Sequence, residues 1–207
     1  FILSVISCGK STEENVNDAV SKTNDTIFGG SGGSTASAGD EAPTKVVFGK
    51  TILAPGTTKS NEFEESGSDV IKTSSGDYVV VGTSISWEWP MPDNMDDILI
   101  VKLDGNGNIL WNKKIHHRNF DSGTSIVEDN DGNYVITGFT SSNAETKSDV
   151  FFGKVDPQGN VLAKKAINIS KNDGGYSISK TADGGFVIGG EAGHHHNEDF
   201  MILKVDQ

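Results

Sequence analysis

The sequence predicts an all-β fold made of repeated four-stranded antiparallel units, and three observations lead to this prediction. Three segments share one layout of glycine, β-forming residues, a glycine-centred turn and an aromatic residue: 67–78, 123–134 and 175–186. Their spacing is nearly constant, because 56 residues separate Tyr78 from Tyr134 and 52 separate Tyr134 from Phe186. Each is followed by an apolar run and then by a second run that begins with Asp and ends with Lys. A period near fifty residues, carried by strands and turns, indicates about four strands per repeat.

Taken in chain order, each repeat is expected to begin with an outer strand, at 45–52, 108–115 and 160–167. The next strand lies around 69–73, 125–129 and 177–181, and the third at 78–83, 134–140 and 186–191. The fourth lies at 98–103, 150–155 and 200–205. Three repeats of four strands predict twelve strands in all.

The turns favour antiparallel pairing. The fourth strand of one repeat is joined to the outer strand of the next by 104–108 and by 156–160, both rich in Asp, Asn and Gly. Pro157 presets φ for a type I turn, and Gly159 supplies the left-handed residue that follows. The third and fourth strands are apolar on both sides, so both faces of each unit must be covered. Radially stacked four-stranded blades provide such cover.

Segments 121–126, 131–140, 149–156 and 159–160 resemble the repeats of bacterial secreted β-propellers, sometimes called seven-bladed β-propeller repeats. Such repeats occur in cell-surface proteins and lipoproteins. The resemblance covers 45–207 and implies four-stranded antiparallel blades around a central axis. Propellers close with four or more blades, and the sequence holds three units. We therefore expect an open or truncated propeller that is incomplete at the C-terminus.

The N-terminus predicts a lipid anchor. Residues 1–8 read as the end of a lipoprotein signal peptide, and Val5-Ile6-Ser7-Cys8 resembles the bacterial lipobox, in which the cysteine is lipidated. The resemblance implies lipidation of Cys8 and a place in the bacterial cell envelope, at the outer membrane or cell surface or on the periplasmic side. The alternative is an incidental thiol in a disordered terminus. Residues 9–44 form a Gly/Ser-rich tether that we expect to be disordered.

Composition narrows the range of partners. The formal net charge is −12, which argues against binding to nucleic acid and to anionic lipid through charge. No catalytic constellation, cofactor motif or metal motif is found. Asp104 and Asp129 begin loops that resemble calcium loops in composition, but neither has an acidic twelfth residue, so Asx turns explain them.

Candidate ligand-binding residues all fall on connections at one end of the predicted strands. Trp87 and Trp89 lie in the longest loop, His116 and His117 follow an outer strand, and His195 lies in the last loop. Exposed tryptophans on loops stack against sugars or peptides, although they also cap the edges of blades. Adjacent histidines cannot all face one ion, so a solvated polar loop is preferred to a metal site at either histidine cluster.

These observations favour a binding module: a membrane-anchored extracytoplasmic lipoprotein whose propeller repeats bind a glycan or protein through the loop end. Two alternatives stay open. One is a carbohydrate-active propeller enzyme that uses scattered carboxylates as an acid–base pair. The other is a surface spacer or scaffold without a ligand.

Overall fold

The computed structural model separates residues 1–51 from residues 52–207, and the description below concerns the second part. Within it the structure describes residues 52, 63–86, 96–141, 147–194 and 197–206. All regular elements of these residues are β-strands, which confirms the prediction of an all-β fold. Over the same ranges no helix has the length and apolar character needed to cross a membrane. The strands are β1 (Phe63–Lys72), β2 (Tyr78–Ser86), β3 (Asp96–Leu103), β4 (Ile109–Ile115), β5 (Phe120–Glu128), β6 (Tyr134–Ser141), β7 (Ser148–Val155), β8 (Val161–Ile167), β9 (Asn172–Lys180), β10 (Phe186–His194) and β11 (Asn197–Val205).

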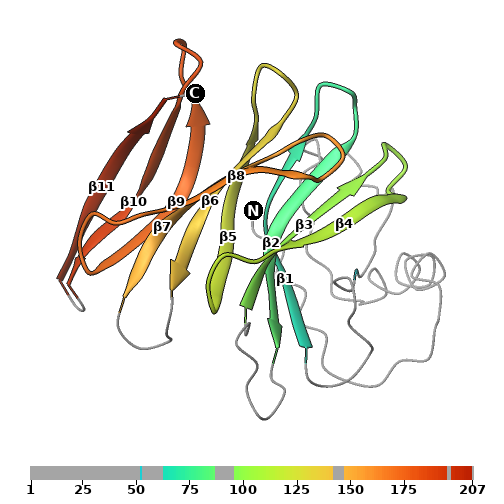
Figure 1. Ribbon diagram of the computed structural model, residues 1–207. Coiled ribbons are helices and arrows are strands. Elements are labelled where there is room, and N and C mark those ends of the chain that lie inside the picture. Colours follow the sequence, from blue (N-terminus) through green and yellow to red (C-terminus); the bar gives the residue numbers. More distant parts are fainter. Residues whose placement is uncertain (1–51, 53–62, 87–95, 142–146, 195–196, 207) are drawn as a thin grey trace, which may run out of the picture. The chain divides into compact units, whose positions relative to one another are not determined.

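The strands form three antiparallel meanders that follow one another along the chain (Figure 1). The meanders are β1–β4, β5–β8 and β9–β11, with each strand paired to its predecessor. The strands predicted to open the second and third repeats, β4 and β8, thus pair with the strand before them, and from here on a repeat means one of these meanders. Single parallel pairs, Asp96 with Phe120 and Ser148 with Asn172, join one repeat to the next. The predicted outer strand at 45–52 lies outside the described residues, apart from Ile52.

The first two strands of each repeat are longer than the sequence patterns indicate, because they continue past a pair of facing glycines. Register shifts occur at Gly67/Asp69 in the first repeat and at Gly123/Ser125 in the second. The facing residue must be glycine, since a Cβ on Gly82 would lie 1.8 Å from the Ser66 carbonyl oxygen. The glycines therefore mark β-bulges inside strands and not strand ends.

The opposite ends of the strands close with tight turns of the predicted kind. Gly76, Gly107, Gly132, Gly159 and Gly184 all have φ between 82° and 90°, the left-handed region that glycine adopts without strain. Figure 1 shows these turns joining β1 to β2, β3 to β4, β5 to β6, β7 to β8 and β9 to β10. The described connections 116–119 and 168–171 lie at the other end of the strands.

The hydrophobic core lies between successive repeats. Each repeat has a forward face toward the next repeat and a back face toward the preceding one. On the forward face of the first repeat, Ile98 and Ile100 are buried with Ile126 and Phe151 on the back face of the second. The forward face of the second repeat packs in the same way against the third. The buried residues of this second core cluster are Val135 and Val150 from the second repeat and Ile178, Phe186, Ile188 and Met201 from the third.

Candidate functional site

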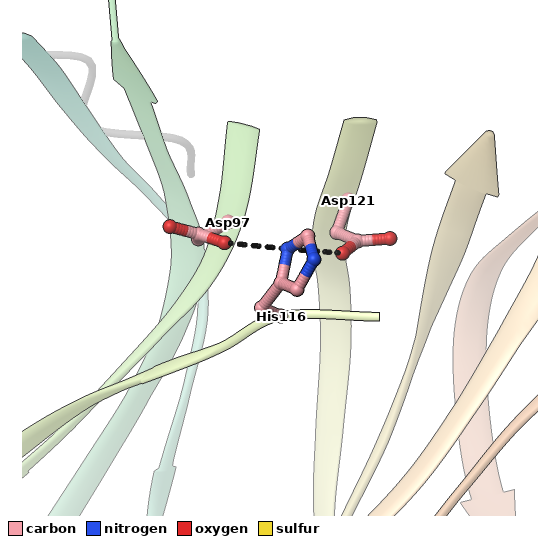
Figure 2. A group of neighbouring side chains, drawn as sticks. All are labelled: Asp97, His116 and Asp121. Atoms are coloured by element: carbon pink, nitrogen blue, oxygen red, sulfur yellow. Dashed lines mark hydrogen bonds and ion pairs between the residues drawn. The ribbon is translucent and has the colours of Figure 1, made fainter. Parts of the chain in front are cut away.

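Where consecutive repeats meet, polar side chains from three segments converge at the loop end of the strands. Asp97 stands at the start of β3, His116 directly follows β4, and Asp121 lies near the start of β5. Figure 2 shows the His116 ring between the two carboxylates. The three segments come together because β3 pairs with β4 and also pairs with β5 at Asp96.

The geometry of this corner cluster, Asp97–His116–Asp121, is close. His116 Nδ1 lies 3.2 Å from Asp97 Oδ1 and 3.7 Å from Asp121 Oδ2. Lys114 Nζ lies 3.7 Å from the other oxygen of Asp97. The Asp121 side chain is completely buried, whereas the His116 side chain is 41% exposed. The imidazole is therefore the part of the cluster that a ligand can reach.

Asp121 braces the connection that precedes β5. Its Oδ2 accepts hydrogen bonds from the backbone N–H groups of His117 and Arg118, and its Oδ1 accepts one from the Thr140 hydroxyl. In the third repeat Asp173 does the same for Ile169 and Ser170, at 2.7 and 2.8 Å. A carboxylate that satisfies two backbone donors holds a loop without regular structure.

The bond between Asp97 and His116 also has a counterpart. At the next boundary Asn168 Nδ2 donates to Asp149 Oδ1 over 2.7 Å. His116 is equivalent in sequence position to Asn168. The hydrogen bond from His116 Nδ1–H to Asp97 therefore replaces the one that Asn168 donates to Asp149. The imidazole adds a ring and a second nitrogen, Nε2, which the asparagine does not have.

Two titratable groups beside the cluster are shifted. Burial raises the pKa of Asp96, and the carboxylates of Asp97 and Asp121 raise it further. Burial lowers the pKa of His117, an effect that Asp121 opposes and that neighbouring cations reinforce. The His117 ring packs edge-on against Phe151, with centroids 5.8 Å apart. The site thus favours a neutral ring at His117. It also places the Asp96 carboxyl, whose pKa is raised, beside the carboxylates of Asp97 and Asp121.

Contacts across the repeat boundary hold the cluster in place. The Arg118 guanidinium bonds to Asp149, and Lys164 Nζ donates to the His116 carbonyl oxygen. Asp149 and Lys164 belong to the second repeat, whereas Arg118 and His116 follow the last strand of the first. The position of the imidazole therefore depends on the packing of the two repeats.

The cluster also has the donor set of a cation site. One ligand atom from each of Asp97, His116 and Asp121 lies within 4.8 Å of the others. Imidazole nitrogen and carboxylate oxygen suit zinc or nickel. The nearest oxygen of Asp121, however, already accepts two backbone hydrogen bonds, and Asp97 faces Lys114. These partners satisfy the carboxylates as they stand.

Of the residues singled out from the sequence, the structure brings His116 and His117 together with Asp97 and Asp121. Trp87, Trp89, His195 and Cys8 lie outside the described residues. The strands on either side of the tryptophan segment meet at the pair Ile85–Asp96, next to the cluster. Sequence reasoning missed the aspartates. Their recurrence at equivalent positions, Asp97 with Asp149 and Asp121 with Asp173, could have revealed them.

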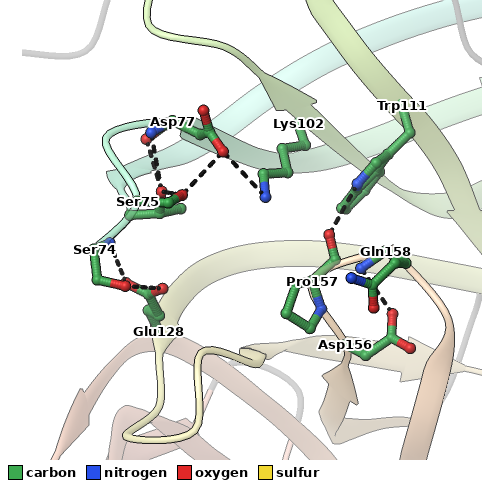
Figure 3. A network of polar contacts seen from close by, with 10 residues as sticks. Ser74, Ser75, Asp77, Lys102, Trp111, Glu128, Asp156, Pro157 and Gln158 are labelled. Carbon is green, nitrogen blue, oxygen red and sulfur yellow. Dashed lines mark hydrogen bonds and ion pairs between the residues drawn. The ribbon is translucent and has the colours of Figure 1, made fainter.

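At the turn end, polar groups are occupied by structural bonds (Figure 3). A lysine one residue before the end of the third strand pairs with a carboxylate in the turn between the first two strands. Lys102 lies 3.2 Å from Asp77, and Lys154 lies 2.8 Å from Asp129. Trp111 Nε1 donates to the Pro157 carbonyl oxygen over 3.1 Å and so ties the first repeat to the second.

The loops that resemble calcium loops in composition are Asx turns. Asp104 Oδ1 accepts the backbone N–H groups of Asn106 and Asn108, at 2.9 and 2.8 Å. Asp129 and Asp156 make the equivalent bonds in their own turns. The carboxylates at these positions thus serve the turn itself, as expected from composition.

Comparison with known proteins adds little. No family model and no curated protein matches the chain. Among solved structures, the chain is similar to a protein of unknown function from Bacteroides caccae, at 11% identity and a TM-score of 0.40. The match covers 72% of this chain and 48% of that one, so the chain spans about half of that protein's length. The function is therefore argued from the residues of the corner cluster.

Proposed function

We propose that this chain is a ligand-binding module of the bacterial cell envelope, anchored through a lipid on Cys8 and built from β-propeller-type repeats. The observation that carries the binding proposal is the half-exposed His116 ring held between Asp97 and Asp121 at the loop end. The ends of the paired strands β3, β4 and β5 position this group, and binding sites on β-scaffolds are usually held at strand ends in this way.

The chemistry of the corner favours a polar, uncharged ligand such as a glycan, or a protein segment. The imidazole offers a hydrogen-bonding edge, and Asp96 offers a carboxyl whose pKa is raised by burial and by neighbouring carboxylates. Trp87 and Trp89 precede Asp96 in the chain and would add stacking surfaces. The three consecutive antiparallel meanders support the choice of a propeller-type scaffold.

The test is a glycan and peptide array probed with the full chain and with single variants. Trp87→Ala and Trp89→Ala remove the stacking rings. His116→Asn removes the imidazole but keeps the hydrogen-bond donor that Asn168 provides in the next repeat. Gln158→Ala, on an exposed turn at the opposite end, is the matched control.

We expect His116→Asn and at least one tryptophan variant to weaken binding by about tenfold or more while Gln158→Ala leaves it unchanged. Equal binding by all four variants would show that the loop end is not the site. An array without any ligand would favour the spacer alternative.

A second candidate is a carbohydrate-active enzyme, favoured by one observation: Asp96 has a raised pKa beside two carboxylates. A carboxyl with a raised pKa beside other carboxylates is the kind of pair that glycosidases use as acid and base. Incubation with the glycan found on the array, followed by product analysis, tests this candidate. Turnover that Asp96→Asn abolishes would establish it, and an unchanged glycan would exclude it.

A further inference from the structure

The forward face of the third repeat is apolar and open. The pairs Gly82–Leu99, Gly138–Phe151 and Gly190–Met201 align the three repeats residue by residue. In this alignment Phe200 is equivalent to Ile98 and Val150, and Ile202 to Ile100 and Phe152. Ile98, Ile100 and Val150 are fully buried by the next repeat, whereas Phe200 is 81% and Ile202 is 70% exposed. The third repeat therefore presents the same surface as the first two, without the cover.

The back face of the first repeat is open in the matching place. Val70 on β1 is equivalent to Ile126 on β5 and Ile178 on β9. Those two isoleucines are 3% and 6% exposed because they pack on the preceding repeat, while Val70 is 57% exposed. On the same face Ile52 packs against Leu99, Val101 and Leu103 of β3.

We propose that the forward face of β9–β11 binds the back face of the β1–β2 hairpin in a second copy of this chain, head to tail. The two open surfaces are the two halves of an interface that the molecule already forms twice. One copy provides Phe200 and Ile202, and the other provides Val70. Such a contact is heterologous, so successive copies form a closed ring or an open chain.

Steric detail supports the match. A Cβ on Gly123 would lie 2.5 Å from Val81, and one on Gly175 would lie 2.2 Å from Thr137, so each boundary needs a glycine pressed against the preceding repeat. In the third repeat the residue equivalent to Val81 and Thr137 is Gly189, where a Cβ would meet nothing within 4 Å. The hollow there has a volume of about 440 Å³. Gly67 is the equivalent glycine that a second copy would bring.

Polar groups are also in register. Asp69 Oδ2 accepts the Ile126 N–H over 3.0 Å, and Ser125 Oγ accepts the Ile178 N–H over 3.4 Å. The next acceptor in this series is Ser177, on the open face. Its partner in the second copy would be the N–H of Val70, the residue equivalent to Ile178. In the single chain this N–H donates to Asp69 Oδ1 over 2.8 Å, so docking would exchange that bond for one to Ser177.

The boundary between the first and second repeats also holds a cation–π contact. Lys102 Nζ lies 5.7 Å from the centroid of the Tyr134 ring on the following repeat. Lys204 is equivalent to Lys102, and Tyr78 of a second copy is equivalent to Tyr134. The docked pair would therefore form the same cation–π contact.

The experiment separates the two halves of the interface. Ile202→Glu blocks the forward face, and Val70→Glu blocks the back face, and both positions are exposed in the single chain. Leu162→Glu is the matched control, because Leu162 is 55% exposed and its equivalent Leu110 stays 52% exposed although its repeat has a neighbour. Association is measured by sedimentation velocity over a concentration series.

We expect the wild type and Leu162→Glu to associate, and each interface variant alone to associate at least about tenfold more weakly. A mixture of Ile202→Glu with Val70→Glu should form a one-to-one dimer, because one intact pair of faces remains. A monomeric wild type overturns the proposal. If the wild type is monomeric and Ile202→Glu has a lower melting temperature, the chain covers the forward face with its own residues, which also overturns the proposal. A mixture that stays monomeric also overturns it. The proposal does not depend on the ligand proposed above.

Discussion

Replacing Ala192 by threonine should stabilise the protein, because it supplies a hydrogen bond that the third repeat lacks. In the second repeat Asp121 faces Thr140 across the sheet, and the hydroxyl donates to Asp121 Oδ1. The equivalent residues in the third repeat are Asp173 and Ala192, which also face each other. Asp173 is buried, and its Oδ1 has no hydrogen-bond partner.

A hydrogen bond to a charged acceptor contributes roughly 1.5–3 kcal/mol, and the threonine side chain loses some rotamer freedom when it forms one. We therefore expect Ala192→Thr to raise the free energy of unfolding by about 1–2 kcal/mol. Ala192→Val is the matched control, since valine has the shape of threonine without the hydroxyl. Thr140→Val is the reciprocal change, and it should cost about 1–3 kcal/mol by leaving Asp121 Oδ1 unpaired.

Urea denaturation of the four proteins measures these differences, with a constant m-value as the check that only stability has changed. The decisive comparison is threonine against valine at position 192. If the two are equally stable, or if Thr140→Val has no effect, the hydrogen bond contributes nothing and the reasoning from repeat symmetry is wrong.

Three further predictions concern other parts of the chain. Burial favours the neutral form of His117, so the folded protein protonates this imidazole less readily than the unfolded chain does, and stability should fall as pH decreases through about 6.5. His117→Gln should reduce this dependence of the free energy of unfolding on pH, measured by denaturation between about pH 5.5 and 7.5. An unchanged dependence would contradict the lowered pKa of His117. Gly132 and Gly159 both have φ of 82°, but only at Gly159 would a Cβ lie 3.2 Å from Trp111. Gly132→Ala should therefore cost about 1 kcal/mol and Gly159→Ala clearly more, and equal losses would show that the ring moves aside freely. A fatty-acid analogue should label the wild type in a bacterial host and not Cys8→Ser, and equal labelling of both would exclude lipidation at this residue.

Much of the fold follows from local chemistry that the sequence displays directly. The alternation of apolar runs with Gly-centred turns placed the eleven described strands, because side-chain pattern and turn geometry act over a few residues. Pro157 and Gly159 predicted their turn, and Gly159 has the expected positive φ. Strand ends were predicted less well, since the glycines at the bulges look like terminators until the close approach of the facing strand is known.

The candidate site was only half visible in the sequence. His116 and His117 stand out as polar residues after a strand, but their partners Asp97 and Asp121 do not. Asp97 precedes an apolar run and Asp121 precedes a Ser/Gly/Thr segment, so each looks like an ordinary strand boundary. Their convergence on one imidazole depends on the pairing of β3 with β4 and on the contact of β3 with β5, which are tertiary facts.

The sequence by itself determined the repeat, its strands and which side chains share a face, because a strand alternates its side chains with a period of two. Only the tertiary structure decided what covers each face. Ile98–Val101 and Phe200–Leu203 are equally apolar in sequence, yet Ile98 is buried and Phe200 is 81% exposed. The difference lies in whether a neighbouring repeat packs against the face, and burial is a property of that packing and not of the strand.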